Sequence, residues 1–284
     1  VGPACNRAEV TSHCSTRAPP GTNHLGLGWV LLAGTLAGTL AASSTREQDP
    51  GPIREKAMDM AQNSFDDRYQ GCRYKMEVAL KKLHHAEFKN HIYADTWRKA
   101  AKRWRNSNRP QGLRRKYAVA VLAYTADTDL YSLFNKAVRY GGSSRKHYLQ
   151  SFHFKTLHFF LTEALQTLRK AQGRKCYNVY RGVRGIHFTA RHHQTVRFGQ
   201  FASASLQKNE ENEVLIPPYE IFRVTNFTRD RDGNVIHLRS HGAHSNYKCA
   251  LLKVSSVPAP AARSKCPFSP QPCWGGGERA AVRC

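Results

Sequence analysis

"FGQFASASLQKNEENEVLIPP", residues Phe198 to Pro218, joins two short apolar runs through a polar, acidic segment. The whole chain has 44 lysines and arginines against 20 acidic residues, which gives a formal net charge of +24. The segment nevertheless holds two hydroxyls and three carboxylates, Ser203, Ser205, Glu210, Glu211 and Glu213. Acids gathered in a basic chain indicate a chemical use for negative charge at this point.

The pattern around this stretch indicates the fold class. From Cys176 onward the chain has short β-rich runs separated by turn residues: YNVYRG, TVRFGQFAS, NEVLIP, EIFRVTNF and NVIHLRS. Before Cys176, apolar residues recur at helical spacing. Helices first and strands later predict an α+β fold, with an N-terminal helical part followed by a mainly antiparallel β core.

Four helices are expected in the first half of the chain. Two have apolar residues at helical spacing, namely Met76, Leu80, Leu83 and Phe88 in one, and Trp97, Ala100, Ala101 and Trp104 in the other. DLYSLFNKAVRYGG predicts a third helix, which Gly141 and Gly142 end. SFHFKTLHFFLTEALQTLRKA predicts an amphipathic fourth, with one face formed by Phe154, Leu157, Leu161, Ala164, Leu165 and Leu168. YAVAVLAYT, Tyr117 to Thr125, predicts a strand.

The 284 residues divide by composition into four parts. Residues 1–24 are an atypical N-terminal stretch, and residues 25–43 form a short apolar run typical of a secretory signal, with cleavage expected near Ala41 to Ser44. The alternative is a transmembrane anchor, which the length and the Gly and Thr content disfavour. Residues 63–254 form the predicted domain, and residues 255–284 are a loose tail rich in Pro, Gly and Cys.

These features predict a secreted protein without a stable membrane anchor. No second apolar run stands near Cys284, as a C-terminal lipid-anchor signal would require. Eight cysteines are typical of an oxidising compartment, and their spacing matches no zinc ribbon, so no metal is expected. Three of them, Cys72, Cys176 and Cys249, lie in the predicted domain, so at least one has no partner there. Asn226-Phe227-Thr228 is a glycosylation sequon.

The region from Arg98 to Lys116 contains nine lysines and arginines. This density is compatible with binding of polyanions such as heparin or nucleic acid. The alternative, a solvated helix face and loop, is the favoured explanation of the run.

The carboxylates suggest chemistry on a sugar. If ENEVLI is a strand, its period of two places Glu211 and Glu213 on one face, and two close carboxylates repel, so one pKa rises. Such a pair can stabilise an oxocarbenium-like state and serve the incoming nucleophile. The alternative is an acidic loop leading into a strand. Arg181, at the end of VYRG, can bind a pyrophosphate with its guanidinium, or it is a surface arginine before a turn.

Taken in order, YRG, FGQFASAS and ENEVLIPP bring arginine, serine and Glu-x-Glu onto successive strands. Here the sequence resembles the vertebrate arginine-specific mono-ADP-ribosyltransferases, especially the avian NAD(P)+–arginine enzymes. The resemblance runs from about Asn63 to Cys249 and includes NSFDDRYQGC, SFHFKTLHFFLTEALQTLR, VYRGVRG, VRFGQFAS, EVLIPPYEIF and HSNYKC. It implies transfer of ADP-ribose from NAD or NADP to arginine side chains of proteins, with release of nicotinamide.

The resemblance also implies residue roles. Arg181 and Ser203 would hold NAD at the phosphates and the nicotinamide ribose, and Tyr124 and Gln200 would line the same cleft. Glu213 would hydrogen-bond the ribose 2′-hydroxyl and stabilise the oxocarbenium ion. Glu211 would orient the acceptor arginine and help to remove its proton. Cys72 would form a disulfide with Cys249.

The chain departs from the family between the serine and glutamate motifs, where only Leu206 to Glu210 stand in place of a much longer segment. In the family that segment supplies core strands and the cysteine that pairs with the equivalent of Cys176. The predicted core is therefore incomplete, and a direct hairpin could bring Glu213 beside Ser203 only with a changed strand order. Three readings follow: an active transferase, a non-catalytic secreted polyanion-binding protein, and a misfolded product without function.

Overall fold

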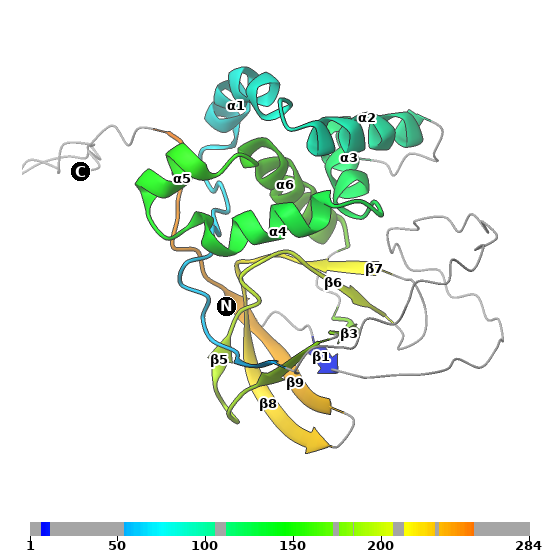
Figure 1. The fold of residues 1–284 in the computed structure, drawn as a ribbon, viewed down its shortest axis with the longest axis vertical. Coiled ribbons are helices and arrows are strands. Elements are labelled where there is room, and N and C mark those ends of the chain that lie inside the picture. The colour runs from blue at the N-terminus through cyan, green and yellow to red at the C-terminus, as the bar shows by residue number, and fades with distance from the viewer. Residues whose placement is uncertain are drawn as a thin grey trace, which may run out of the picture. The chain divides into compact units, whose positions relative to one another are not determined.

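The structure, a computed structural model, describes residues 7–11, 54–105, 112–172, 176–183, 185–206, 213–230 and 233–252. Glu211, the signal-like residues 25–43 and the tail 255–284 lie outside these ranges, so the predictions made for them stay predictions. In the described part the chain forms helices first and a largely antiparallel sheet afterwards, as the sequence pattern predicts (Figure 1).

Six helices lie in the described residues: α1 (Arg73–Glu87), α2 (His91–Arg105), α3 (Arg115–Tyr124), α4 (Leu130–Gly141), α5 (Arg145–Ser151) and α6 (Lys155–Gln172). The four expected helices correspond to α1, α2, α4 and α6. One buried cluster joins them, with aromatic side chains such as Phe65, Tyr93, Phe134 and Phe159 at its centre. Among the described residues no helix is long and apolar enough to span a membrane.

The predicted strand at Tyr117 to Thr125 is wrong, because these residues form helix α3 and the turn after it. Most residues of α3 are buried, and the helix packs against α2 and α6. A short run that is apolar on all sides has no period to distinguish helix from strand. Its three alanines favour the helix once neighbouring helices cover every face.

Helix α6 is the central helix, and its first ten residues, 155–164, are all buried. The sequence predicts the apolar face correctly, but the opposite face is buried too, with Lys155, Thr156, His158, Thr162 and Glu163 on it. The Glu87 carboxylate caps this helix, accepting hydrogen bonds from the backbone amides of Lys155 (2.6 Å) and Thr156 (3.0 Å). Burial raises the pKa of Glu87, and these two amides act against that rise.

His158 shows how α6 accommodates a buried polar side chain. Its Nε2 lies 3.1 Å from the carbonyl oxygen of Phe65, which can only accept, so Nε2 carries the proton. Nδ1 then accepts a hydrogen bond from the Tyr69 hydroxyl at 2.7 Å. Complete burial lowers the pKa of His158 to about 3, and the ring is therefore neutral and structural.

The strands form two sheets. The larger has the order β5-β8-β9-β1-β3-β6-β7, and the smaller pairs β2 with β4. Their bounds are β1 Arg7–Thr11, β2 Arg54–Ala57, β3 Asn178–Gly182, β4 Ile186–Thr189, β5 Thr195–Val196, β6 Ala202–Ser205, β7 Glu213–Ile216, β8 Glu220–Asp230 and β9 Gly233–Ala243. Neighbours in the larger sheet are antiparallel except β1 and β3, which are parallel.

The run TVRFGQFAS forms two strands rather than one, because the chain bends between β5 and β6. Gly199 lies in this bend with φ +66°, a conformation that favours glycine. A Cβ at Gly199 would approach the Ala61 Cβ to 2.3 Å, so the close packing requires glycine as well. Because of this bend, β5 lies at one edge of the larger sheet, whereas β6 lies beside β7 at the other end.

Strand β1 comes from outside the predicted domain and occupies the middle of the larger sheet. Arg7–Thr11 pair in parallel with Asn178–Gly182 of β3 and antiparallel with residues 235–239 of β9. The chain thus completes its sheet with an N-terminal segment, although the stretch between the serine and glutamate motifs is short. No pattern in residues 1–24 predicts this strand.

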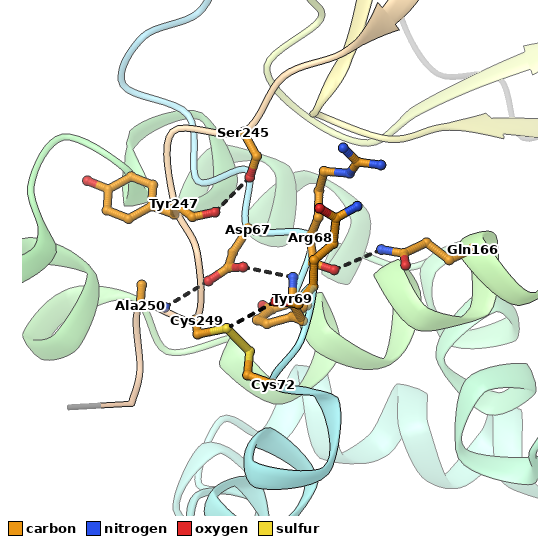
Figure 2. The surroundings of a disulfide bond; sticks show 10 residues. Asp67, Arg68, Tyr69, Cys72, Gln166, Ser245, Tyr247, Cys249 and Ala250 are labelled. Atoms are coloured by element: carbon orange, nitrogen blue, oxygen red, sulfur yellow. Dashed lines mark hydrogen bonds between the residues drawn. A yellow bond between two sulfur atoms is a disulfide. The ribbon is translucent and has the colours of Figure 1, made fainter. Parts of the chain in front are cut away.

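Two links tie the segment before α1 to the end of the sheet region. Cys72 and Cys249 form the disulfide that the resemblance implies, and Asp67 beside it accepts hydrogen bonds from the backbone amides of Tyr69 and Ala250, both at 2.8 Å (Figure 2). Burial raises the pKa of Asp67, and these amide hydrogen bonds oppose the rise. Cys176, the third cysteine of the described residues, is exposed and has no disulfide.

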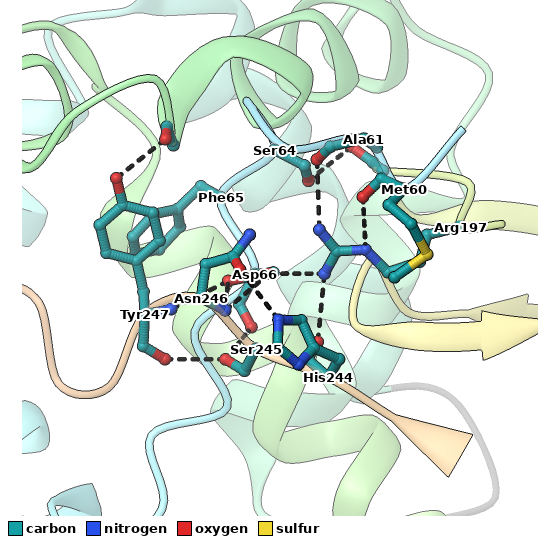
Figure 3. A network of polar contacts seen from close by, with 12 residues as sticks. Met60, Ala61, Ser64, Phe65, Asp66, Arg197, His244, Ser245, Asn246 and Tyr247 are labelled. Carbon is teal, nitrogen blue, oxygen red and sulfur yellow. Dashed lines mark hydrogen bonds and ion pairs between the residues drawn. The ribbon is translucent and has the colours of Figure 1, made fainter. Parts of the chain in front are cut away.

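The second link is a fully buried ion pair between Asp66 and Arg197, with Nη1 and Oδ2 2.6 Å apart (Figure 3). The guanidinium also donates to the backbone oxygens of Met60, Ala61 and His244. The carboxylate accepts from the amides of Asn246 and Tyr247. With this many partners for both charges, the pair joins three chain segments without leaving a buried charge unsatisfied.

Candidate active site

Three of the predicted site residues meet at one end of the larger sheet, on the adjacent strands β3, β6 and β7. Strands β6 and β7 pair in antiparallel fashion, as in a direct hairpin, with Ser203 opposite Leu215 and Ser205 opposite Glu213. Because side chains alternate along a strand, Ser203 and Glu213 share a face. The Ser203 hydroxyl donates to Glu213 Oε1 at 2.5 Å.

Arg181 joins this pair from β3. Its Nη1 donates to the backbone oxygen of Ser203 at 2.5 Å, and its Nη2 lies 3.4 Å from the Tyr131 hydroxyl. Both partners are neutral oxygens, and among the described residues no ion pair engages this guanidinium. A partly buried arginine without a carboxylate partner retains donors for an anionic substrate group such as a diphosphate.

Glu213 is partly buried, and its surroundings act on the carboxyl in opposite directions. Burial raises the pKa of Glu213 above the usual range, while the Ser203 hydrogen bond and the Arg181 charge lower it. Burial has the largest effect, so the net shift is upward. A carboxylate held close to an arginine in a partly dehydrated site is suited to stabilise positive charge that develops on a substrate.

Tyr124 lies close enough for the charges of Arg181 and Glu213 to act on its hydroxyl, and Gln200 contacts helix α4. Tyr124 is buried, its hydroxyl donates to the Phe201 backbone oxygen at 2.8 Å, and burial raises its pKa well above the usual value. Its ring packs on that of Tyr131, with centroids 5.2 Å apart. Gln200 accepts a hydrogen bond from Arg139 through Oε1. Through the Phe201 oxygen, Tyr124 thus fixes the backbone directly before β6.

One helix face takes part in the site, and the sequence analysis missed it. Tyr131, Asn135 and Arg139 are spaced four residues apart on α4, so they lie on one face. Each contacts a predicted site residue: Tyr131 contacts Arg181, Asn135 donates to the Tyr124 hydroxyl at 3.0 Å, and Arg139 donates to Gln200. The sequence contains a signal for this face: polar residues recur every four positions beside the apolar face of α4.

Three other predictions concern Glu211, the basic region and metal binding. Glu211 lies outside the described residues. In the basic region, Arg98, Lys99, Lys102, Arg103 and Arg105 are exposed on α2, and Arg98 pairs with Asp95. This arrangement is that of a solvated helix face. Across the described ranges no group of three or more His, Cys, Asp or Glu side chains could hold a metal ion.

Comparison with known proteins identifies the family and the fold. The sequence profile of the family described as NAD:arginine ADP-ribosyltransferase matches residues 58–210 and 207–246. The chain therefore belongs to the NAD:arginine ADP-ribosyltransferase family, and it is a family enzyme for transfer of ADP-ribose to arginine. The profile matches in two pieces that overlap at residues 207–210, between the serine and glutamate motifs.

Individual relatives agree with this result. NAD(P)(+)–arginine ADP-ribosyltransferase 2 of Gallus gallus is 45% identical over 303 aligned residues, which cover 90% of this chain and 96% of the relative. That alignment is longer than this chain of 284 residues, so part of the relative has no counterpart here. GPI-linked NAD(P)(+)–arginine ADP-ribosyltransferase 1 of Mus musculus is 42% identical over 265 residues, covering 78% of each chain.

A solved structure supports the fold. The crystal structure of the mono-ADP-ribosyltransferase ART2.2 superposes with a TM-score of 0.57 and 30% identity, covering 68% of this chain and 98% of ART2.2. Mutants of ART2.2 were also crystallised in complex with NADH and with NAD. The expected α+β architecture is thus confirmed by a solved relative.

Proposed function

We propose that this chain transfers ADP-ribose from NAD to protein arginine through the site formed by Arg181, Ser203 and Glu213. The observation that carries the proposal is the Ser203–Glu213 hydrogen bond. It supports a site that assembles although the segment between the two motifs is short. The proposal concerns the activity of this chain itself, beyond its membership of the family.

The reaction breaks the bond between the ribose C1′ and nicotinamide, which leaves as a neutral molecule. Arg181 would hold the diphosphate of NAD, because its guanidinium has donors that no carboxylate occupies. Glu213 would accept a hydrogen bond from the ribose 2′-hydroxyl and stabilise positive charge on the ring. Ser203 would keep the Glu213 carboxylate in place. These contacts suit NAD and NADP alike, since they involve the shared diphosphate and ribose.

The acceptor then forms the new bond at C1′ with a guanidinium nitrogen. An arginine side chain has a pKa above about 12 and is a poor nucleophile until it loses a proton. Glu211 would orient the acceptor and take that proton. Tyr124 and Gln200 would act indirectly. The Tyr124 hydroxyl holds the Phe201 backbone in position, and the Gln200 side chain holds Arg139.

The names of the relatives include GPI-linked enzymes, and we propose an extracellular location for this chain too. The Cys72–Cys249 disulfide supports an oxidising compartment. Secretion through the signal-like residues 25–43 is the finer form of this proposal. The intact mass of protein collected from the medium of expressing cells tests it, because cleavage near Ser44 removes the preceding residues.

The experiment that tests the activity measures nicotinamide release from NAD and transfer of labelled ADP-ribose to agmatine. We expect Glu213→Gln to lower both rates by about a hundredfold or more, as loss of a charge-stabilising group does. Glu211→Gln should keep nicotinamide release and lose transfer to agmatine. Glu55→Gln, which changes an exposed carboxylate paired with Arg229, serves as the control and should leave both rates unchanged.

Two results would contradict the proposal. Equal rates in the wild type and Glu213→Gln would remove Glu213 from the reaction. A folded but inactive wild-type chain would mean that the short connection does not support catalysis, and the chain would then be a transferase by ancestry only.

A further inference from the structure

The outer face of the β8–β9 hairpin carries two arginines directly opposite each other, Arg223 and Arg239. Both side chains are exposed. The register extends the row across the sheet, with Thr195 of β5 beside Arg223 and the backbone position of Arg7 beside Arg239. Like charges directly opposite on neighbouring strands destabilise a sheet. We therefore expect this pair of arginines to serve a function that offsets the loss of stability.

The described residues provide no anion for this pair. Neither guanidinium has a hydrogen bond or an ion pair among them. Glu220 is buried and accepts a hydrogen bond from the Ser240 hydroxyl. Because side chains alternate along β9, Ser240 and Arg239 point to opposite faces of the sheet. The register places Glu9 opposite His237, two positions along the strand from the arginine row. Among the side chains that the structure describes, neither arginine therefore has an anionic partner.

The arginines border a hollow of about 410 Å³ that is lined by His193, Arg223, Thr225, Arg239, Ser240 and His241. His193 enters it from the turn before β5, with φ +64°, which is uncommon for any residue other than glycine. Its backbone amide donates to the Val224 oxygen at 2.9 Å, so the turn is fixed to β8. Two arginines and two histidines thus converge from three segments on one concave surface.

This hollow is separate from the transferase site. Strands β5, β8 and β9 form one end of the larger sheet, whereas Arg181, Ser203 and Glu213 lie on β3, β6 and β7 at the other end, with β1 between the two groups (Figure 1). The arginines of the hairpin therefore have no part in holding the diphosphate of NAD. The hollow also lies outside the basic region Arg98 to Lys116.

We propose that this hollow binds a sulfated oligosaccharide. Neighbouring strands lie about 4.8 Å apart, so Arg223 and Arg239 present two cationic groups side by side, which fits a linear chain with repeated anionic groups better than a single small ion. Guanidinium groups bind tetrahedral oxyanions through paired hydrogen bonds. Sites for single-stranded nucleic acid add aromatic stacking surfaces, and the hollow contains no Phe, Tyr or Trp among its lining residues, which favours the glycan.

The test is binding of a fluorescently labelled, heparin-derived octasaccharide, measured by anisotropy at several salt concentrations. We expect Arg223→Gln/Arg239→Gln to weaken binding about tenfold or more, as loss of charge-assisted hydrogen bonds does. The slope of log Kd against log salt should fall by about one for each arginine removed. The matched control is Lys99→Gln/Arg103→Gln, which removes two exposed charges from α2 and should retain wild-type affinity.

Thermal melting provides a second readout that does not depend on the label. The octasaccharide should raise the Tm of the wild type and of the control, because a ligand that binds only the folded state stabilises it, and it should not raise the Tm of the arginine variant. NAD at millimolar concentration should not displace the octasaccharide, since the two sites are separate.

Three results would overturn the proposal. The first is equal affinity of the arginine variant and the wild type, and the second is an equal loss in the α2 control, which would show that net charge alone determines binding. The third is equally tight binding of a DNA oligonucleotide with the same number of charges, which would assign the hollow to polyanions without preference for a sulfated glycan.

Discussion

Glu213 is the residue whose surroundings bear most directly on the proposed chemistry. Burial raises its pKa, and the Ser203 hydroxyl and the Arg181 charge lower it. The ionised carboxylate is the form that stabilises a cationic ring, so activity should fall as the pH decreases through this raised pKa. In the pH profile of nicotinamide release, we therefore expect the rate to fall on the acidic side at a higher pH than it would with a glutamate of ordinary pKa.

Ser203→Ala should move that acidic limb further upward. The substitution removes a hydrogen bond that favours the ionised carboxylate, so the pKa of Glu213 rises. Nicotinamide release measured from pH 4 to pH 9 gives the limb, and Ser132→Ala on the exposed side of α4 is the control. A limb that stays in place or moves to lower pH in Ser203→Ala would show that the hydrogen bond does not stabilise the carboxylate.

The Asp66–Arg197 pair gives a prediction on stability at the same scale. Asp66→Asn leaves the Arg197 charge buried without a counter-ion, which costs about 3–5 kcal/mol of unfolding free energy. Asp95→Asn breaks the exposed Arg98–Asp95 pair and should cost less than about 1 kcal/mol. Urea denaturation followed by circular dichroism compares them, and similar losses in the two variants would refute the structural role of the buried pair.

At the scale of elements, α4 and β1 show how neighbouring segments complete the site. Helix α4 supports the motif strands through Tyr131, Asn135 and Arg139. Strand β1 fills the position between β9 and β3, with Val10 opposite Ile236 on one side and Arg181 on the other. The strand that carries Arg181 therefore depends on β1 for one of its two neighbours.

Val10→Pro tests this dependence. Proline removes the backbone donor and is excluded from central strands, so we expect a loss of roughly 2 kcal/mol or more in unfolding free energy and a parallel loss of nicotinamide release. Val10→Thr keeps the backbone N–H and a β-branched side chain and should behave as the wild type. Unchanged stability and activity in the proline variant of the uncleaved chain would mean that β1 does not belong to the sheet.

The predicted signal cleavage has a physical consequence for this element. A cut near Ser44 would detach Arg7–Thr11 and leave β9 and β3 with unpaired edges in the middle of the sheet. The intact mass of the secreted protein shows whether the N-terminal strand stays with the domain.

At the scale of the whole molecule, the Cys72–Cys249 disulfide closes a loop with a sequence separation of 177 residues. The chain-entropy account gives about 5 kcal/mol of stabilisation for a loop of this length. We expect Cys72→Ser/Cys249→Ser to lose a few kcal/mol in urea denaturation, whereas Cys176→Ser, at an exposed free cysteine, should lose almost nothing. Equal stability of the double variant and the wild type would show that the polar contacts of Asp66 and Asp67 suffice.

Local patterns predicted those elements in which one face alone is buried. The run DLYSLFNKAVRYGG, ended by Gly141 and Gly142, predicted α4, and the β-rich runs TVRFGQFAS and NEVLIP predicted the strands β6 and β7. The same reasoning failed for α3 and overlooked the buried polar face of α6. Both helices are covered on all sides, so their sequences lack the contrast between faces that period analysis requires.

The order of Arg181, Ser203 and Glu213 along the chain was enough to predict which strands carry the site, because residue types and their spacing are local properties. The sequence also predicted the helices-first architecture and, through the family resemblance, the disulfide. Only the tertiary structure decided that Glu213 lies within hydrogen-bonding distance of Ser203, that α4 supports Arg181 and Gln200, and that Arg7–Thr11 complete the sheet. These are contacts between distant segments, and they depend on how elements pack together rather than on any pattern within one of them.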